Sequence, residues 1–241
     1  MAEITSPQIC IIVPAFNEAG NITAVIADIR SHRPEAAIVV VDDGSTDDTL
    51  TIARSLKVTA LRLPVNLGIG GAVQTGLKYA VRNGFDFAVQ FDGDGQHLAV
   101  ELAKILPPVI QGTADVAIGS RFIGSHSAYH AGIARQVGIK IISWVSSLLT
   151  GQRITDPTSG FRAYNRRALE FLADDYPQDY PEPEALIALA RNRFRVLEIA
   201  VEMKPRAEGR SSISSWGAGY YMAKVLLAIL VTSIRTRTPE A

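Results

Sequence analysis

The sequence predicts an α/β domain built on a mostly parallel central sheet with helices on both faces. Along the first half, short apolar segments rich in β-branched residues alternate with longer segments whose apolar residues recur at helical spacing. The short segments are apolar throughout, which is typical of strands that are buried on both faces of a sheet. With 241 residues, of which 47% are hydrophobic, the chain is long enough to bury such a core.

The expected elements follow one another in a regular order over the first half. The predicted strands occupy residues 8–13, 38–41, 59–63, 85–91 and 115–118, and the predicted helices occupy residues 21–30, 46–56, 70–81 and 98–110. Ile22, Val25 and Ile29 illustrate the helical spacing. Ser45 or Thr46 is expected to cap the second helix, because a side-chain oxygen at that position can accept a hydrogen bond from a first-turn amide.

The second half is less regular. Helices are predicted at residues 133–149 and 184–191, a strand at 194–201 and a final helix after the polar stretch 204–215. Residues 155–162 are expected to form a loop, and residues 177–183, which contain three prolines, are expected to resist regular structure. The chain is therefore predicted to be one domain, residues 1–212, followed by a helical appendage at 213–241.

Charge and cysteine content exclude several classes of protein. Lys plus Arg and Asp plus Glu each number 24, so the chain lacks the basic field that nucleic-acid binding requires. Cys10 is the one cysteine and lies in an apolar strand, which favours a core position and a reducing, cytoplasmic compartment. Residues 1–7 have no signal-peptide pattern.

The most apolar stretch, residues 220–234, is interrupted by Lys224, and its uncharged part covers only residues 225–234. A spanning helix needs about 20 apolar residues, so this segment is expected to lie on a membrane or to pack on protein.

An acidic segment follows the fourth predicted strand. Asp92-Gly93-Asp94-Gly95-Gln96 places two carboxylates on either side of a glycine, where the backbone can turn both toward one ligand. Ligands of a parallel sheet bind beyond the carboxyl ends of its strands, which is where this segment lies. Carboxylate oxygens suit Mg²⁺ or Mn²⁺. A solvated turn is the alternative interpretation.

A second acidic segment, Asp42-Asp43-Gly44-Ser45, follows the second predicted strand. A carboxylate there can accept hydrogen bonds from a base N–H or a ribose hydroxyl, or it can cap the following helix, and the pattern leaves both open. The glycines at 68, 70 and 71 do not match the dinucleotide-binding fingerprint, which belongs in the first strand–helix turn, and no phosphate-binding loop of the Walker A type is present.

Five segments in this order resemble glycosyltransferase family 2, and within it the dolichyl- and polyprenyl-phosphate sugar synthases. They are Pro14-Ala15-Phe16-Asn17-Glu18, Val41-Asp42-Asp43-Gly44-Ser45, Asn66-Leu67-Gly68, Asp92-Gly93-Asp94-Gly95-Gln96-His97 and Gly119-Ser120-Arg121-Phe122. The resemblance implies a GT-A fold and inverting transfer of a sugar from a nucleotide-diphosphate sugar, with UDP, GDP or dTDP as the nucleotide, to a polyprenyl phosphate. It also implies a donor-binding half at residues 1–124 and an acceptor-binding half at 125–212.

The resemblance assigns the donor side residue by residue. Pro14, Glu18 and Asp43 are expected to hold the nucleoside, with Phe16 stacking on it and Val41 contributing backbone. Asp92, Gly93 and Asp94 are expected to hold the diphosphate, with Asp92, Asp94 and Gln96 as ligands of Mg²⁺ or Mn²⁺. Arg121 is expected to contact the donor and, with Asp94, to be catalytic. Arg206 matches the mobile cationic loop of the synthases, but Ser212 stands where they carry lysine, and Arg210 is the nearby substitute.

The acceptor side rests on fewer matches. The segment 156–162 resembles the family's acceptor-side loop, so Ser159 and Arg162 are expected to bind acceptor, as is Arg135 on the preceding helix. A guanidinium suits a phosphate because it can bind it with two parallel hydrogen bonds.

The nature of the acceptor decides whether a general base is needed. A phosphate acceptor is already largely anionic at pH 7, since its second pKa is about 6. A sugar hydroxyl in a cell-surface polysaccharide, the alternative acceptor, needs a base, and Asp156, Glu182 and Glu184 are the candidates. A nucleotide-sugar-binding protein without catalysis is a third hypothesis, which both aspartates of the acidic segment disfavour.

The predicted C-terminal helix indicates where in the cell the protein acts. Trp216, Tyr220 and Tyr221 precede its apolar part, and Arg235 and Arg237 follow it. This arrangement favours a helix at the membrane interface. The alternative is packing on the domain or on a second subunit. We therefore expect a peripheral protein on the cytoplasmic face of the membrane, with a homo-oligomer or a separate membrane subunit as further expectations.

Overall fold

The computed structural model of the chain describes residues 7–123, 133–204 and 218–234, without the side chains of 133–137 and 218–223. A seven-stranded sheet in the order β3-β2-β1-β4-β6-β5-β7 forms its centre. The strands are β1 (Ile9–Ala15), β2 (Ala37–Asp42), β3 (Thr59–Arg62), β4 (Phe87–Gln90), β5 (Val116–Ser120), β6 (Arg162–Asn165) and β7 (Val196–Ala200). β6 is antiparallel to both of its neighbours, and the other pairs are parallel. The predicted mostly parallel sheet is confirmed.

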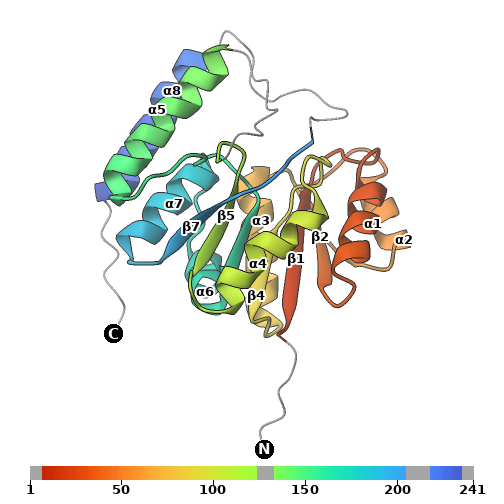
Figure 1. Cartoon of the computed structure of the whole chain (residues 1–241). Helices are drawn as coiled ribbons and strands as arrows, with labels where there is room; N and C mark the ends of the chain where they lie inside the picture. Colours follow the sequence, from red (N-terminus) through yellow and green to blue (C-terminus); the bar gives the residue numbers. More distant parts are fainter. Residues whose placement is uncertain (1–6, 124–132, 205–217, 235–241) are drawn as a thin grey trace, which may run out of the picture.

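Helices cover both faces of the sheet (Figure 1). They are α1 (Ile22–His32), α2 (Thr49–Ser55), α3 (Gly68–Arg82), α4 (Leu102–Ile110), α5 (Ile133–Thr150), α6 (Arg166–Asp174), α7 (Pro181–Arg191) and α8 (Ala218–Ile234), with a 3₁₀ turn, η1 (Ala99–Glu101), before α4. Successive residues of a strand point to opposite faces, so Ile11 packs with α1, α2 and α4 while Ile12 packs with α3, α6 and α7. Both faces are apolar, which explains why the strands lack alternation.

The second half differs from its prediction at two places. β6 and α6 occupy residues that carried no predicted element, and the Asn165 side chain caps α6 by accepting a hydrogen bond from the amide of Ala168 (3.0 Å). α7 begins at Pro181, inside the stretch predicted to be irregular. Proline is tolerated in the first turn of a helix because an amide there has no partner within the helix.

The predicted cap of the second helix is also wrong. α2 begins at Thr49, and its first-turn amide donates a hydrogen bond to Asp47 Oδ1 (3.0 Å), not to Ser45 or Thr46. Both hydroxyl residues instead bond to the loop after β1, as described below.

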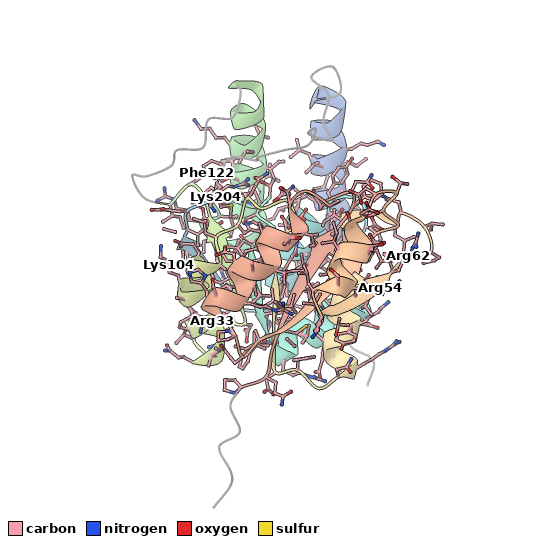
Figure 2. All side chains as sticks on the ribbon, turned by 90° about the vertical axis from the view of Figure 1, so that its right-hand side faces the viewer. Arg33, Arg54, Arg62, Lys104, Phe122 and Lys204 are labelled. Atoms are coloured by element: carbon pink, nitrogen blue, oxygen red, sulfur yellow. The ribbon has the colours of Figure 1, made fainter. Side chains whose placement is uncertain are left out.

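The predicted C-terminal helix is present as α8, and it pairs with α5. Ile142 of α5 and Val225 and Ile229 of α8 form a small core with Ile187 of α7. Both helices extend beyond the end of the sheet at which the parallel strands finish, which is the upper end in Figure 1 and in Figure 2. Among the helices in the described ranges, none combines the length and the apolar character needed to cross a bilayer.

Candidate active site

The candidate site lies at the carboxyl ends of β1, β2 and β4. In Figure 2, Phe122 and Lys204 lie at this end of the molecule, whereas Arg33, directly after α1, lies toward the opposite end. The loops after β1 and β2 are joined by hydrogen bonds: the Asn17 amide donates to Ser45 Oγ (3.0 Å), and the Thr46 amide donates to Asn17 Oδ1 (2.9 Å). Asn17 has φ of 55°, a conformation that asparagine adopts more readily than most residues. This junction leaves Phe16 exposed beside the turn.

Asp43 caps a helix, but not the one that follows it in sequence. Its carboxylate accepts hydrogen bonds from the amides of Leu67 (2.7 Å) and Gly68 (2.9 Å) at the start of α3. Burial raises the pKa of Asp43, and the charge of Asp42 adds to this, so that together they outweigh the two amide hydrogen bonds. The contact ties the second motif to the segment 66–68 that the resemblance also singled out.

The acidic loop after β4 holds its two aspartates in different ways. Asp94 accepts hydrogen bonds from the amide (3.1 Å) and the side-chain Nε2 (2.9 Å) of Gln96. Asp92 Oδ2 lies 3.1 Å from Nε2 of His97, a buried imidazole. The Gly93 amide donates to the carbonyl of Pro14 (3.2 Å), which fixes the loop against the first motif.

The surroundings of Asp92 favour its charged form. Burial acts to raise its pKa, but the charge and hydrogen bond of His97 oppose this, with further contributions from the Gln90 amide and Arg121, and the net shift of the pKa is downward. No described atom forms a hydrogen bond with Asp92 Oδ1. The loop therefore presents a charged carboxylate with capacity for a ligand, although the described residues contain no cluster of three or more His, Cys, Asp or Glu side chains arranged for a metal.

Gly160 brings the segment before β6 against the acidic loop. A Cβ at this position would lie 2.7 Å from Asp92 Oδ2 and 3.0 Å from Gln90 Nε2, so any side chain here would displace one of them. The close approach places the predicted acceptor-side segment next to the predicted metal ligands.

Arg121 is held by a carboxylate of that same segment. Its Nε and Nη2 each lie 2.7 Å from the buried carboxylate of Asp156, and its amide donates to Asp156 Oδ2 (3.1 Å). Glu198 of β7 in turn accepts hydrogen bonds from the amides of Thr155 (2.7 Å) and Asp156 (2.8 Å). Asp156 is thus engaged with a cation, which lowers its availability as a general base.

The two predicted acceptor-binding residues of this segment lie inside the turn. Arg162 is fully buried and donates to the carbonyls of Ser159 (2.7 Å) and Pro157 (3.0 Å), while its Nη1 bonds to no described atom. The hydroxyl of Ser159 donates to the carbonyl of Gly119 (2.6 Å).

The two glutamates at the start of α7 have different described partners. Glu184 accepts hydrogen bonds from the Tyr180 amide (3.1 Å) and from Thr232 Oγ1 of α8 (3.0 Å), so it caps α7 and joins it to α8. Glu182 interacts electrostatically with Arg162 and Asp92. Burial raises the pKa of Glu182, the positive charge of Arg162 opposes this, and the negative charge of Asp92 adds to it.

Three of the predicted site residues have side chains outside the described part of the chain. Arg206 and Arg210 lie outside the described residues, and so does the side chain of Arg135, whose backbone belongs to α5. Lys204, the last described residue before them, donates its amide to the carbonyl of Gln96 (2.8 Å), so the chain enters residues 205–217 beside the acidic loop. The residues that sequence reasoning missed are His97, Gln90 and Glu198. His97 ends a recognised motif but was given no role, whereas Glu198 lies in a strand whose sequence gives no sign of a functional residue.

A parallel sheet whose strand ends carry acidic loops is the architecture of an α/β enzyme that binds its ligand at that edge. The model of the family described as glycosyl transferase family 2 matches residues 10–172, and the chain belongs to this family. The prediction of a glycosyltransferase is confirmed.

Two curated relatives cover most of the chain. A UDP-N-acetylglucosamine–dolichyl-phosphate N-acetylglucosaminyltransferase of Methanococcus voltae is 33% identical over 80% of this chain and 84% of its own length. A polyprenol monophosphomannose synthase of Mycolicibacterium smegmatis is 31% identical over 89% of this chain and 84% of its own.

Among solved structures, glucosyl-3-phosphoglycerate synthase of Mycobacterium tuberculosis in complex with Mn²⁺, UDP and glucosyl-3-phosphoglycerate superposes with a TM-score of 0.68. The match covers 97% of this chain and 82% of that one at 18% identity. The likeness confirms the GT-A fold.

Proposed function

We propose that the chain transfers a sugar, with inversion, from a nucleotide-diphosphate sugar to a polyprenyl phosphate. The observation that carries this is the acidic loop at the strand ends, where Oδ1 of Asp92 bonds to no described atom, in a chain whose two relatives above act on dolichyl phosphate and polyprenol phosphate by name. Both relatives are matched over most of their length, so the resemblance includes the acceptor-side half.

Donor binding is assigned to the motif residues at the strand ends. Phe16, Glu18 and Asp43 lie in the loops proposed for the nucleoside, and Pro14 and Val41 lie near the ends of β1 and β2 that lead into them. The exposed ring of Phe16 is available for stacking on a base. Arg121, which Asp156 holds with two short contacts, is proposed to face the diphosphate with Arg206 and Arg210.

A divalent cation fits the oxygen donors of the acidic loop. Asp92 and Asp94, with the amide oxygen of Gln96, would hold Mg²⁺ or Mn²⁺. The Oδ1 atom of Asp92, to which no described atom bonds, supports this assignment. When bound, the cation supplies neutralisation of the charge that develops on the departing diphosphate. The fold relative above was crystallised with Mn²⁺ and UDP, which is consistent with either ion here.

On the acceptor side, the proposal needs no strong base. A phosphate oxygen is already anionic at neutral pH, and Asp156 is engaged with Arg121. Ser159, Arg162 and Arg135 stay as the proposed acceptor contacts. A sugar hydroxyl is the second candidate acceptor, and one observation favours it: Glu182 has a raised pKa beside Asp92, as a general base tuned toward neutral pH would have.

A lipid acceptor also requires contact with a membrane, and α5 and α8 offer a surface for it. Ile141, Trp144 and Leu148 form an exposed apolar stripe on α5, and Leu227, Leu230, Val231 and Ile234 form one on α8. Trp144 is 67% exposed and Leu148 is 68% exposed. Such a group of large apolar side chains on a protein surface usually marks a place where a partner or a membrane binds. We propose that a lipid surface covers these two stripes, because the acceptors named for the two relatives are lipids. The protein is therefore proposed to be peripheral on the cytoplasmic face.

The test is an acceptor and donor screen. Purified protein is incubated with labelled UDP-, GDP- and dTDP-sugars and Mn²⁺, with undecaprenyl phosphate in one arm and oligosaccharides in the other. A lipid-linked product supports the proposal, and product only in the oligosaccharide arm supports the second candidate. Binding of donor with no product in either arm would favour a non-catalytic protein. Glu182→Gln then separates the two acceptors, since only transfer to a hydroxyl should depend on that carboxylate.

A further inference from the structure

We infer that His97 is a positioning residue for Asp92: its imidazole fixes the orientation in which that carboxylate meets the divalent cation. The inference rests on the proposed function, because it concerns the metal-binding role assigned to the acidic loop. It adds a residue that does not itself contact the ligand.

The imidazole is packed between two aromatic rings. Its ring stacks on Phe161, with centroids 4.9 Å apart and an angle of 21° between the planes, and it meets the edge of Phe91 at 5.3 Å and 74°. The side chain is only 4% exposed. The ring therefore cannot turn without displacing two buried aromatic side chains.

The backbone of His97 is anchored as well. It forms an antiparallel β-bridge with Met203, and the neighbouring Gln96 carbonyl accepts a hydrogen bond from the Lys204 amide (2.8 Å). A rigid backbone and a packed ring make the direction of Nε2 a fixed property of the fold.

Nε2 points at Asp92 Oδ2, 3.1 Å away, whereas no described atom bonds to Nδ1. With a proton on Nε2, as in the imidazolium or in one of the two neutral tautomers, the ring donates a hydrogen bond to the carboxylate. The backbone of Gly160 also approaches this oxygen closely, since a Cβ there would lie 2.7 Å from it. Asp92 thus meets a donor whose direction is fixed by the packing of the imidazole ring. Groups that orient metal ligands in this way typically change metal affinity by about 10- to 100-fold when removed.

Three substitutions separate the hydrogen bond from the packing. His97→Phe keeps an aromatic ring between Phe91 and Phe161 but removes the donor. His97→Gln loses the ring but places an amide nitrogen near the position of Nε2. His97→Asn carries the same amide on a side chain one methylene shorter, which cannot reach as far, and so serves as the matched control.

Mn²⁺ binding is measured directly, from the electron paramagnetic resonance signal of free Mn²⁺, with and without UDP. We expect His97→Phe and His97→Asn to weaken Mn²⁺ binding by about 10- to 100-fold and His97→Gln to restore most of it. In an Asp92→Asn background, His97→Phe should have no further effect. Thermal unfolding is followed for each variant, so that loss of binding in an unfolded protein is recognised.

The outcomes are distinguishable. Wild-type affinity in folded His97→Phe overturns the positioning role while leaving the proposed function intact. Equal losses in the Gln and Asn variants also overturn it, because they would make the ring and not the hydrogen bond the cause. Failure of the wild-type protein to bind Mn²⁺ with or without UDP would instead overturn the metal-dependent function on which the inference rests.

Discussion

The loops that follow β1, β2 and β4 differ from the segment before β6 in how their charged groups are partnered. On the first side, Asp92 keeps an oxygen to which no described atom bonds, and Phe16 is exposed. On the second side, Arg121 and Asp156 are paired and Glu198 holds the backbone beneath them, although Nη1 of the buried Arg162 bonds to no described atom. The comparison indicates that the first side keeps a carboxylate oxygen for a ligand, while most charged groups of the second side are already paired within the protein.

The largest expected effect comes from breaking the paired side. Asp156→Ala would leave Arg121, which is only 10% exposed, without its carboxylate partner, and removal of one member of a largely buried ion pair typically lowers the free energy of unfolding by about 3–5 kcal/mol. Chemical denaturation measures this. Asp179→Ala, in the exposed segment before α7, is the control and should change stability little. Unchanged stability of Asp156→Ala would remove the distinction between the two sides.

A substitution in the acidic loop should instead lower activity and leave stability nearly unchanged. Asp94→Asn is expected to lower kcat/KM for sugar transfer by about 100- to 1,000-fold, because it weakens a metal contact worth several kcal/mol in the transition state. Its melting temperature should stay close to that of the wild type, since Asp94 is only partly buried. Full activity in this variant would contradict the metal assignment.

The contact between the two sides is tested at Gly160. Gly160→Ala would push a methyl group into Asp92, and a displacement of about 1 Å at a reacting group can cost about 100-fold in rate. We expect kcat/KM to fall by about 10- to 100-fold. If crystals of the variant show Asp92 unmoved and activity is retained, the two sides act independently.

Substitutions in the exposed apolar stripes of α5 and α8 should weaken binding to lipid vesicles moderately and change the rate of sugar transfer little. Replacing Leu148 and Leu227 by Ser removes apolar area that is mostly exposed in the protein, so folding should tolerate it. Sedimentation with anionic phospholipid vesicles should show roughly tenfold weaker binding. Ile110→Ser, at the end of α4, is the matched control, and equal losses in both variants would rule out a specific lipid-facing surface.

The smallest expected effect is on the pH dependence of stability. Asp92 has a lowered pKa in the folded state, so its contribution to stability is present above its unfolded pKa and is lost as pH falls through the folded value. Glu182 has a raised pKa, so the folded state loses stability as pH rises through that value. Glu182→Gln should therefore raise the melting temperature more at pH 8 than at pH 4. A uniform shift across this range would mean that Glu182 does not titrate as inferred.

Most of the sheet and the identity of the loops at its edge could be predicted from the sequence. Doubly buried strands such as Ile9–Ala15 carry an unbroken apolar pattern, and the motifs lie directly after them. β6 could not be predicted, because a four-residue strand that begins with a buried arginine has no such pattern. The partners of Asp43 and Asp156 could not be predicted either, since they lie 24 and 35 residues away in the sequence.

The antiparallel strand β6 has a consequence for how the protein matures. It pairs Phe87 with Asn165 and Gln90 with Arg162, so β4 gains its second neighbour only after about 75 further residues have been synthesised. A nascent chain that ends before Gly160 contains β1, β2, β3 and β4, but it lacks the segment that lies against the acidic loop in the complete chain. Contacts between residues so distant in sequence form late in folding, because closing a long loop costs chain entropy. The edge proposed to be catalytic is therefore completed only when the second half of the chain has emerged from the ribosome, and truncated products should lack the proposed cation binding even where their first strands are folded.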